Sequence, residues 1–249
     1  MERRLVVLGG CGAWPEPGRA CSGFLLEHDG FRVVLDLGYG TLPRLLSLLG
    51  SPTAAGLDAA VVTHDHPDHV VDLHGLLRAR LYDGRGLPRL PLHAPEAVLE
   101  RITGLEDADR ATTEQVFDWR PLPAAASELG PFRLQSRALP HYVPNAGVRL
   151  STPKFTVAYT GDTGPDPALA ELGRDADLFI VDATDRWQQR PGGSGPPLNL
   201  TAREAGAASA AGARRGRGCG RPAGLTATLR DGTLATCPRV RRTGPPSPP

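Results

Sequence analysis

The stretch Thr63-His64-Asp65-His66-Pro67-Asp68-His69 holds three imidazoles and two carboxylates and follows an apolar strand expected over 59–63. Imidazole nitrogen and carboxylate oxygen bind Zn²⁺ at about 2.0–2.2 Å. Residues two apart in an extended segment point the same way, so His64 and His66 can share one metal. Asp68 and His69 come after a proline turn and can face a second metal nearby. The stretch therefore predicts a metal centre rather than a surface cluster of histidines.

Strand and helix patterns alternate around this stretch. Two apolar runs, 23–27 and 31–37, are separated by His28-Asp29-Gly30, which is typical of a hairpin. The other expected strands cover 4–8, 59–63, 131–139, 147–151, 155–160 and 178–181. The expected helices cover 42–49, 73–81, 94–102 and 201–213. Strand pairs followed by helices in two halves predict an α/β domain built in layers.

The composition fits one large folded domain. The chain has 249 residues, of which 40% are hydrophobic and 22% charged, and a formal net charge of +1. These values exclude a wholly disordered chain and give no reason to expect bulk binding to nucleic acid or membranes. The apolar runs are too short for a membrane span, and the four Cys show no CxxC spacing. We therefore expect a reduced, cytoplasmic chain without a signal peptide or membrane partner.

The stretch at 63–69 matches the HxHxDH signature of the metallo-β-lactamase superfamily, and the sequence resembles its ribonuclease Z-like and cyclic-nucleotide phosphodiesterase-like branches. The likeness covers about residues 4–213. It includes Leu35-Asp36-Leu37-Gly38, Pro140-His141-Tyr142-Val143-Pro144, Tyr159-Thr160-Gly161-Asp162-Thr163-Gly164, Asp182-Ala183-Thr184 and the segment 200–206. The resemblance implies an α/β fold of the αββα sandwich type, with a two-zinc site at one edge of the sheets.

The resemblance also implies the ligands and the chemistry. The ligands carried over are His64, His66 and His141 for the first zinc, Asp68 and His69 for the second, and Asp162 as the bridge. Asp68 and Asp162 are the residues expected to act in catalysis. Two metals about 3.5–4 Å apart can hold an attacking hydroxide and neutralise a phosphodiester in the transition state. The expected substrate is a small phosphodiester such as a cyclic nucleotide, or the 3′ end of an RNA.

Four further residues are interpreted individually. Asp36 matches an Asp that supports the metal-binding loop by hydrogen bonding in the family. His74 is interpreted as an ordinary helix residue, because it follows the cluster by five positions without a motif. His28 and His93 carry no motif either and are expected to be structural or exposed.

The sequence departs from the family after His141, because no later His is present. Asn199 occupies the position of a His that donates a proton or contacts phosphate, and an amide cannot relay a proton. The family's last His ends a late strand, which this sequence lacks. We therefore expect a filled first zinc site and a weakened second one.

Two interpretations stay open: a zinc-dependent phosphodiesterase, and a catalytically impaired or non-catalytic relative. The short loop 183–198 favours a small phosphodiester over tRNA.

The last part of the chain differs in composition from the rest. Residues 214–249 contain eight Arg, one acidic residue and no aromatic residue. We expect a metallo-β-lactamase-like domain over 1–213 and a disordered basic Pro/Gly-rich tail over 214–249, without the last strand and its ligand loop. From about Gly216 the ending is predicted to be out of frame or otherwise altered, with a native basic tail as the alternative. The oligomeric state is open, a homodimer included.

Overall fold

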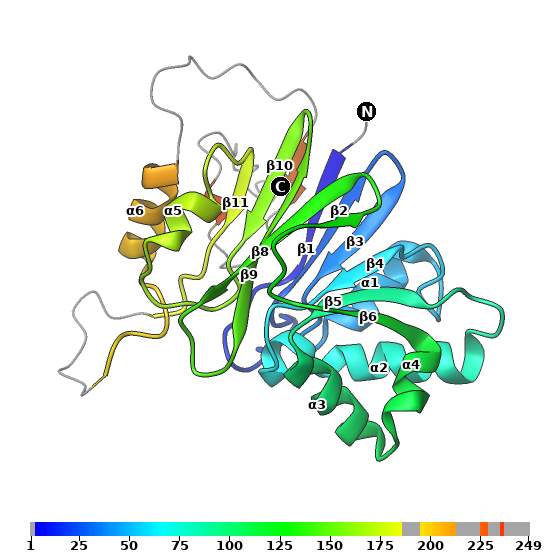
Figure 1. Ribbon diagram of the computed structural model, residues 1–249. Helices are drawn as coiled ribbons and strands as arrows, with labels where there is room; N and C mark the ends of the chain where they lie inside the picture. The colour runs from blue at the N-terminus through cyan, green and yellow to red at the C-terminus, as the bar shows by residue number, and fades with distance from the viewer. Residues whose placement is uncertain (1–2, 186–194, 213–224, 229–234, 237–249) are drawn as a thin grey trace, which may run out of the picture.

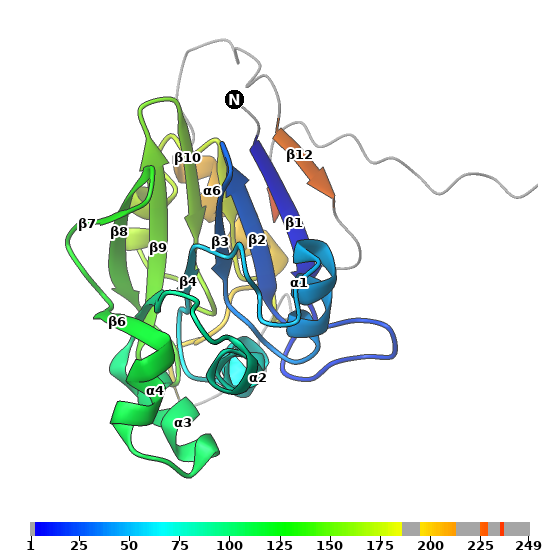
Figure 2. The same cartoon turned by 90° about the vertical axis from the view of Figure 1, so that its right-hand side faces the viewer.

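The structure is a computed structural model that describes residues 3–185, 195–212, 225–228 and 235–236. Two β-sheets lie face to face, and helices cover the outer side of each (Figure 1). Seen after a 90° turn, α1 and α2 lie outside the sheet that contains β1 to β4, and β7 to β10 form the opposite sheet (Figure 2). This arrangement is the αββα sandwich that the sequence predicts.

The first sheet has the strand order β12-β1-β2-β3-β4-β5-β6. Its strands are β1 (Arg3–Gly9), β2 (Gly23–His28), β3 (Phe31–Leu35), β4 (Ala59–Val61), β5 (Leu90–Ala94), β6 (Phe117–Pro121) and β12 (Leu225–Thr228). β2 and β3 form the predicted hairpin, in which Asp29 and Gly30 both have a positive φ, at 49° and 89°. Asp and Gly tolerate this conformation, which two-residue hairpins require.

Strands β3 to β6 pair in parallel, so each connection must cross over the sheet. Helices supply these crossovers: α1 (Thr41–Leu49), α2 (Pro67–Asp83), α3 (Glu96–Glu106) and α4 (Arg110–Val116). All four lie on the outer side of the first sheet, where α2, α3 and α4 are grouped together (Figure 1).

The second sheet has the order β13-β11-β10-β9-β8-β7. Its strands are β7 (Ser127–Leu129), β8 (Phe132–Leu139), β9 (Asn145–Thr152), β10 (Phe155–Tyr159), β11 (Leu178–Ile180) and β13 (Ala235–Thr236). Its outer face is covered by α5 (Ala168–Leu172) and α6 (Ala202–Gly212). Helix α6 begins with the Thr201–Glu204 capping box that the sequence indicates, because Thr201 N–H donates to Glu204 at 2.8 Å.

Three separate apolar clusters hold the four layers together. Alternate residues of one strand enter different clusters, as the period of two in a strand requires. In β2, Phe24 and Leu26 pack between the sheets, whereas Leu25 packs against α1 and α2. The third cluster joins the second sheet to α5 and α6 through residues such as Phe179 and Leu169. Each layer is therefore fixed on at least one apolar face.

Several boundaries differ from the prediction. Helix α2 begins at Pro67, so Asp68 and His69 lie in its first turn and not after a separate turn. Proline suits this place because the first helical N–H groups have no partner within the helix. Helices α4 and α5 and strands β5, β6 and β7 were not predicted, because they are short and only partly apolar.

Two short segments of the expected tail join the sheets. Strand β12 pairs in parallel with β1, and β13 pairs antiparallel with β11. Pairing at a sheet edge uses backbone groups, so it does not need the apolar periodicity on which the prediction rested. The predicted disorder and altered ending concern mostly residues outside those described. Among the described residues, no helix is both long and apolar enough to cross a membrane.

Candidate metal centre

The six predicted ligands come together where strands of both sheets end. His64 and His66 follow β4, Asp68 and His69 open α2, His141 follows β8, and Asp162 follows β10. The two sheets are joined at this point by a hydrogen bond from the N–H of Ala146 to the carbonyl of Thr63, at 2.9 Å. The site therefore lies at one edge of the sandwich, as the resemblance implies.

One group of possible ligands contains His64, His66 and His141, whose ligand atoms all lie within 4.8 Å of one another. His141 Nδ1 donates to the carbonyl of Leu198 at 2.8 Å, which leaves Nε2 without a hydrogen in the neutral ring. That Nε2 faces His66 Nδ1 at 3.0 Å. These three imidazoles match the set predicted for the first metal.

A second group contains His64, His69 and Asp162, also within 4.8 Å. His69 Nε2 lies 3.2 Å from Asp162 Oδ1 and 3.5 Å from Asp68 Oδ2. Asp68 is thus next to this group but not within it, and His64 takes the place that the prediction gave to Asp68. The two groups share His64, which makes this residue the centre of the arrangement.

The environment of His64 tests whether a metal fits. The side chain is fully buried, and Nε2 has no hydrogen-bond partner among the described residues. Its Nδ1 lies 3.0 Å from the hydroxyl of Thr63, which itself donates to Asp36 at 2.9 Å. Because that hydroxyl has a single hydrogen, it accepts from Nδ1, and Nε2 carries a bare lone pair. A buried polar atom without a partner costs about 1–3 kcal/mol, and a metal ion at this point would satisfy it.

Asp36 connects the candidate ligands to the fold, in agreement with the supporting role predicted for it. Its carboxylate is fully buried and accepts from Thr63 N–H at 2.8 Å, from His69 Nδ1 at 2.7 Å and from the hydroxyl of Tyr159 at 2.6 Å. The bond from Nδ1 directs Nε2 of His69 toward Asp162. One carboxylate therefore orients residues from the loop after β4, from α2 and from β10.

The TGDT motif explains how Asp162 reaches the site. Gly161 has φ of 59°, and a Cβ at this position would lie 2.6 Å from the side-chain oxygens of Asn145 and Thr63. Only glycine fits this close approach. The amide of Asn145 then donates to the carbonyl of Asp162 at 2.7 Å, which fixes the backbone beside the carboxylate.

Asn199 and Asp182 form a network that the sequence indicated only through motifs. Asp182 Oδ2 accepts from Leu200 N–H at 3.0 Å and from the Asn199 amide at 3.1 Å. The same amide nitrogen lies 3.4 Å from Asp162 Oδ2. Asn199 thus lies between two carboxylates, in the neighbourhood where the resemblance places a proton-donating His.

An ion pair that the sequence did not predict holds the metal-binding stretch from the other side. Arg101 in α3 donates through Nε and NH2 to Asp65 Oδ2, at 3.0 and 2.5 Å. The two residues are 36 positions apart, and neither carries a pattern that links them. Asp65 therefore turns toward α3, whereas its neighbours His64 and His66 turn toward the site.

Burial and neighbouring charges divide the histidines into two kinds. Burial, and then the neighbouring His69, holds the pKa of His64 well below its usual value, and burial with His141 lowers the pKa of His66. Burial would also lower the pKa of His69, but Asp162 and Asp36 raise it well above the usual value. Burial alone would raise the pKa of Asp162, but the His69, His64 and His141 imidazoles hold it below its usual range. His64 and His66 are therefore neutral, which is the form that binds metals.

The remaining histidines lie apart from this centre. His74 in α2 bonds to Glu106 at 2.8 Å, as an ordinary helix residue would, and His28 and His93 are buried.

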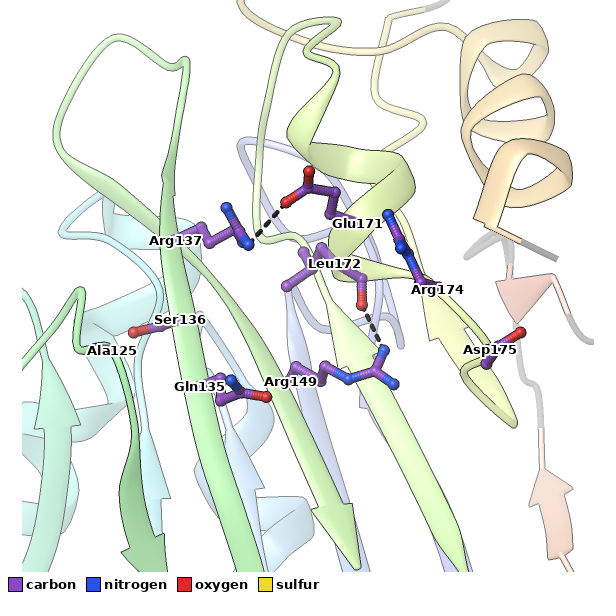
Figure 3. A pocket seen from close by; sticks show the side chains of 9 residues that line it. All are labelled: Ala125, Gln135, Ser136, Arg137, Arg149, Glu171, Leu172, Arg174 and Asp175. Carbon is purple, nitrogen blue, oxygen red and sulfur yellow. Dashed lines mark hydrogen bonds and ion pairs between the residues drawn. The ribbon is translucent and has the colours of Figure 1, made fainter. Parts of the chain in front are cut away.

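A separate pocket on the outer face of the second sheet contains none of the candidate ligands (Figure 3). In it, Arg137 pairs with Glu171 at 2.7 Å, which fastens α5 to β8 (Figure 3).

The two facing sheets with helices outside and the histidine-rich strand ends are features of the metallo-β-lactamase fold. The sequence profile of the beta-lactamase superfamily domain matches residues 31–216, so the chain belongs to that family. It is 35% identical to ribonuclease Z of Kineococcus radiotolerans over 76% of this chain and 62% of the relative, and so spans less than two thirds of that relative. It is 28% identical to the probable metallo-hydrolase YhfI of Bacillus subtilis, over 71% of this chain and 70% of the relative.

Solved structures agree with this assignment. The crystal structure of YhfI from Bacillus subtilis superposes with a TM-score of 0.69 and 26% identity, over 84% of this chain and 82% of the other. The short form of human tRNase Z superposes with a TM-score of 0.68 over 95% of this chain and 99% of the other. At 20% identity, the second comparison supports the fold alone.

Proposed function

We propose that this chain is a zinc-dependent hydrolase that cleaves phosphodiester bonds. The observation that carries the proposal is the bare, buried Nε2 of His64, a residue that belongs to both groups of candidate ligands. His64, His66 and His141 would hold the first ion, and His69, Asp162 and the neighbouring Asp68 would contribute to the second.

The donor set favours zinc. Three imidazoles with one or two carboxylates suit Zn²⁺, whereas sites for Mg²⁺ and Ca²⁺ consist of oxygen ligands. When bound, zinc supplies a Lewis acid and activates a water molecule for attack near neutral pH. The second group contains a single imidazole besides the shared His64, which is why we expect its ion to bind more weakly.

The chain's own residues orient this chemistry. The carbonyl of Leu198 fixes the ring of His141, and the carboxylate of Asp36 fixes the ring of His69. The amide of Asn199 donates toward Asp162 and Asp182, and so reduces the repulsion between two buried carboxylates. Because an amide releases no proton, the leaving group must take its proton from another source.

The proposed substrate is a cyclic nucleotide or the 3′ end of an RNA. A relative named ribonuclease Z supports a phosphodiester substrate, and the relative YhfI, a probable metallo-hydrolase, supports metal-dependent hydrolysis in general. The alternative is a relative with impaired catalysis, and Asn199 in place of a proton donor favours it. We propose the limits of the catalytic domain as 1–213.

Zinc content and turnover separate these possibilities. Purified protein with added zinc should hydrolyse bis-p-nitrophenyl phosphate, and His66→Ala should abolish the hydrolysis. His74→Ala is the matched control, because His74 lies in the same helix region but bonds to Glu106 and not to the ligands. A zinc-loaded wild type without turnover would support the impaired relative, and activity retained in His66→Ala would contradict the proposed site.

A further inference from the structure

One aromatic side chain beside the metal centre is exposed and does not belong to the core. Tyr142 directly follows His141 and keeps 69% of its surface exposed. The centre of its ring lies 5.2 Å from the ring of His141 and 6.4 Å from that of His66. Tyr142 therefore borders two of the three imidazoles of the first group, with most of the ring open to solvent.

The backbone holds this ring in place. Tyr142 lies between Pro140 and Pro144, and proline fixes one backbone angle at each of these positions. The carbonyl of Pro140 accepts from Gly164 N–H at 2.8 Å, which ties the segment to the TGDT motif. Strand β9 begins at Asn145, directly after Pro144. A ring presented on such a short, fixed segment loses little conformational entropy when a ligand packs against it.

No contact among the described residues indicates that the ring of Tyr142 stabilises the fold. The hydroxyl of Tyr142 has no hydrogen-bond partner among the described residues, and the ring belongs to none of the three apolar clusters. Tyr82 offers an instructive comparison, since it is equally exposed, at 68%. Its hydroxyl bonds to Glu106, and Arg78 lies over its ring, so that its neighbours in α2 and α3 account for it.

We propose that Tyr142 is a stacking platform for a nucleobase, and that the substrate is a phosphodiester whose scissile phosphate is linked to a nucleoside. This inference rests on the proposed function and assigns a residue that contacts the base of its substrate. The ring borders the histidines that would hold the metals. A base attached to a phosphate bound at those metals would therefore reach the ring. Stacking of one base on an aromatic side chain changes binding by roughly 5- to 150-fold, and every base has a face that can stack.

Two substrates with the same leaving group isolate this contact. Thymidine 5′-(p-nitrophenyl phosphate) carries a base, whereas methyl p-nitrophenyl phosphate does not. The wild type should prefer the nucleoside substrate by about tenfold or more in kcat/KM, mainly through KM. Tyr142→Phe should keep that preference, and Tyr142→Ala should lose most of it. Tyr82→Ala is the matched control and should behave as the wild type. A preference that survives in Tyr142→Ala, or an equal loss on both substrates, would overturn the proposal.

A binding measurement separates this inference from the proposed function. Calorimetric titration of the zinc-loaded protein with adenosine monophosphate and with ribose 5-phosphate compares ligands that differ only in the base. The wild type should bind the nucleotide about tenfold more tightly, and Tyr142→Ala should bind both ligands equally. If neither substrate is hydrolysed but this difference appears, the proposed function fails and the stacking platform stands. Equal affinities in the wild type would refute the platform, whatever the activity.

Discussion

Replacing Asp36 by Asn is the sharpest test of how the metal centre is supported. The change keeps the size of the side chain and suits its positive φ of 56°, since Asn tolerates this conformation. It converts one carboxylate oxygen into an NH₂ group. Oδ2 accepts from both Tyr159 and His69, at 2.6 and 2.7 Å, and the amide can keep an acceptor on one side only.

The magnitude follows from the bonds that are lost. Hydrogen bonds to a buried charged group contribute about 1.5–3 kcal/mol each, so the loss of two lowers the free energy of unfolding by roughly 3–6 kcal/mol. The amide would also donate to His69 Nδ1 and so move the ring hydrogen to Nε2, the nitrogen that faces Asp162. Hydrogen-bond partners of metal ligands affect the affinity for the metal strongly. The affinity for zinc should therefore fall by about 10- to 100-fold.

Urea unfolding of the zinc-free protein measures the first effect, and competition with a zinc-binding dye measures the second. Asp58→Asn is the control, because exposed Asp58 accepts from Arg32 N–H at 2.7 Å and lies away from the ligands. It should cost less than about 1 kcal/mol and leave zinc affinity unchanged. If Asp36→Asn is as mild as Asp58→Asn in both assays, Asp36 does not organise the site.

Two further predictions concern His93 and Asn199. Burial, followed by Arg120, lowers the pKa of His93 to about 4, so the unfolded chain binds more protons below pH 6.5. The free energy of unfolding should therefore fall by about 2 kcal/mol from pH 7 to pH 5 through this group, and His93→Gln should lose that part in urea unfolding; identical pH dependence in both proteins would refute it. Asn199→His should speed hydrolysis of a dinucleotide by about tenfold more than that of bis-p-nitrophenyl phosphate, whose leaving group needs little protonation. Equal gains would mean that the proton comes from elsewhere.

The fold was predictable from the sequence where local chemistry decides it. Asp29-Gly30 specifies a turn with positive φ, and the Thr201–Glu204 box specifies a helix start, so both elements appeared as expected. The boundary at Pro67 was missed, because proline is compatible with a turn and with the first helical residue. Strand β12 was missed because edge pairing depends on a partner strand that is far away in the sequence.

The candidate site was predictable as a set of residue types but not as an arrangement. The spacing in 63–69 indicates ligands, yet only the packing of both sheets shows that His64 belongs to both groups and Asp68 to neither. The ion pair of Asp65 with Arg101 joins two elements without a shared motif. The position of Asn199 between two carboxylates likewise depends on how the strands end.

Zinc stoichiometry in single-histidine variants tests the central claim most directly, because His64 alone belongs to both groups. Metal analysis by mass spectrometry after dialysis should find zinc in the wild type and in the control His74→Ala. His141→Ala should weaken the binding of the first ion, and His64→Ala should abolish it, because the bare Nε2 of His64 is a ligand of that ion. Zinc at the wild-type stoichiometry in a folded His64→Ala protein would contradict the account.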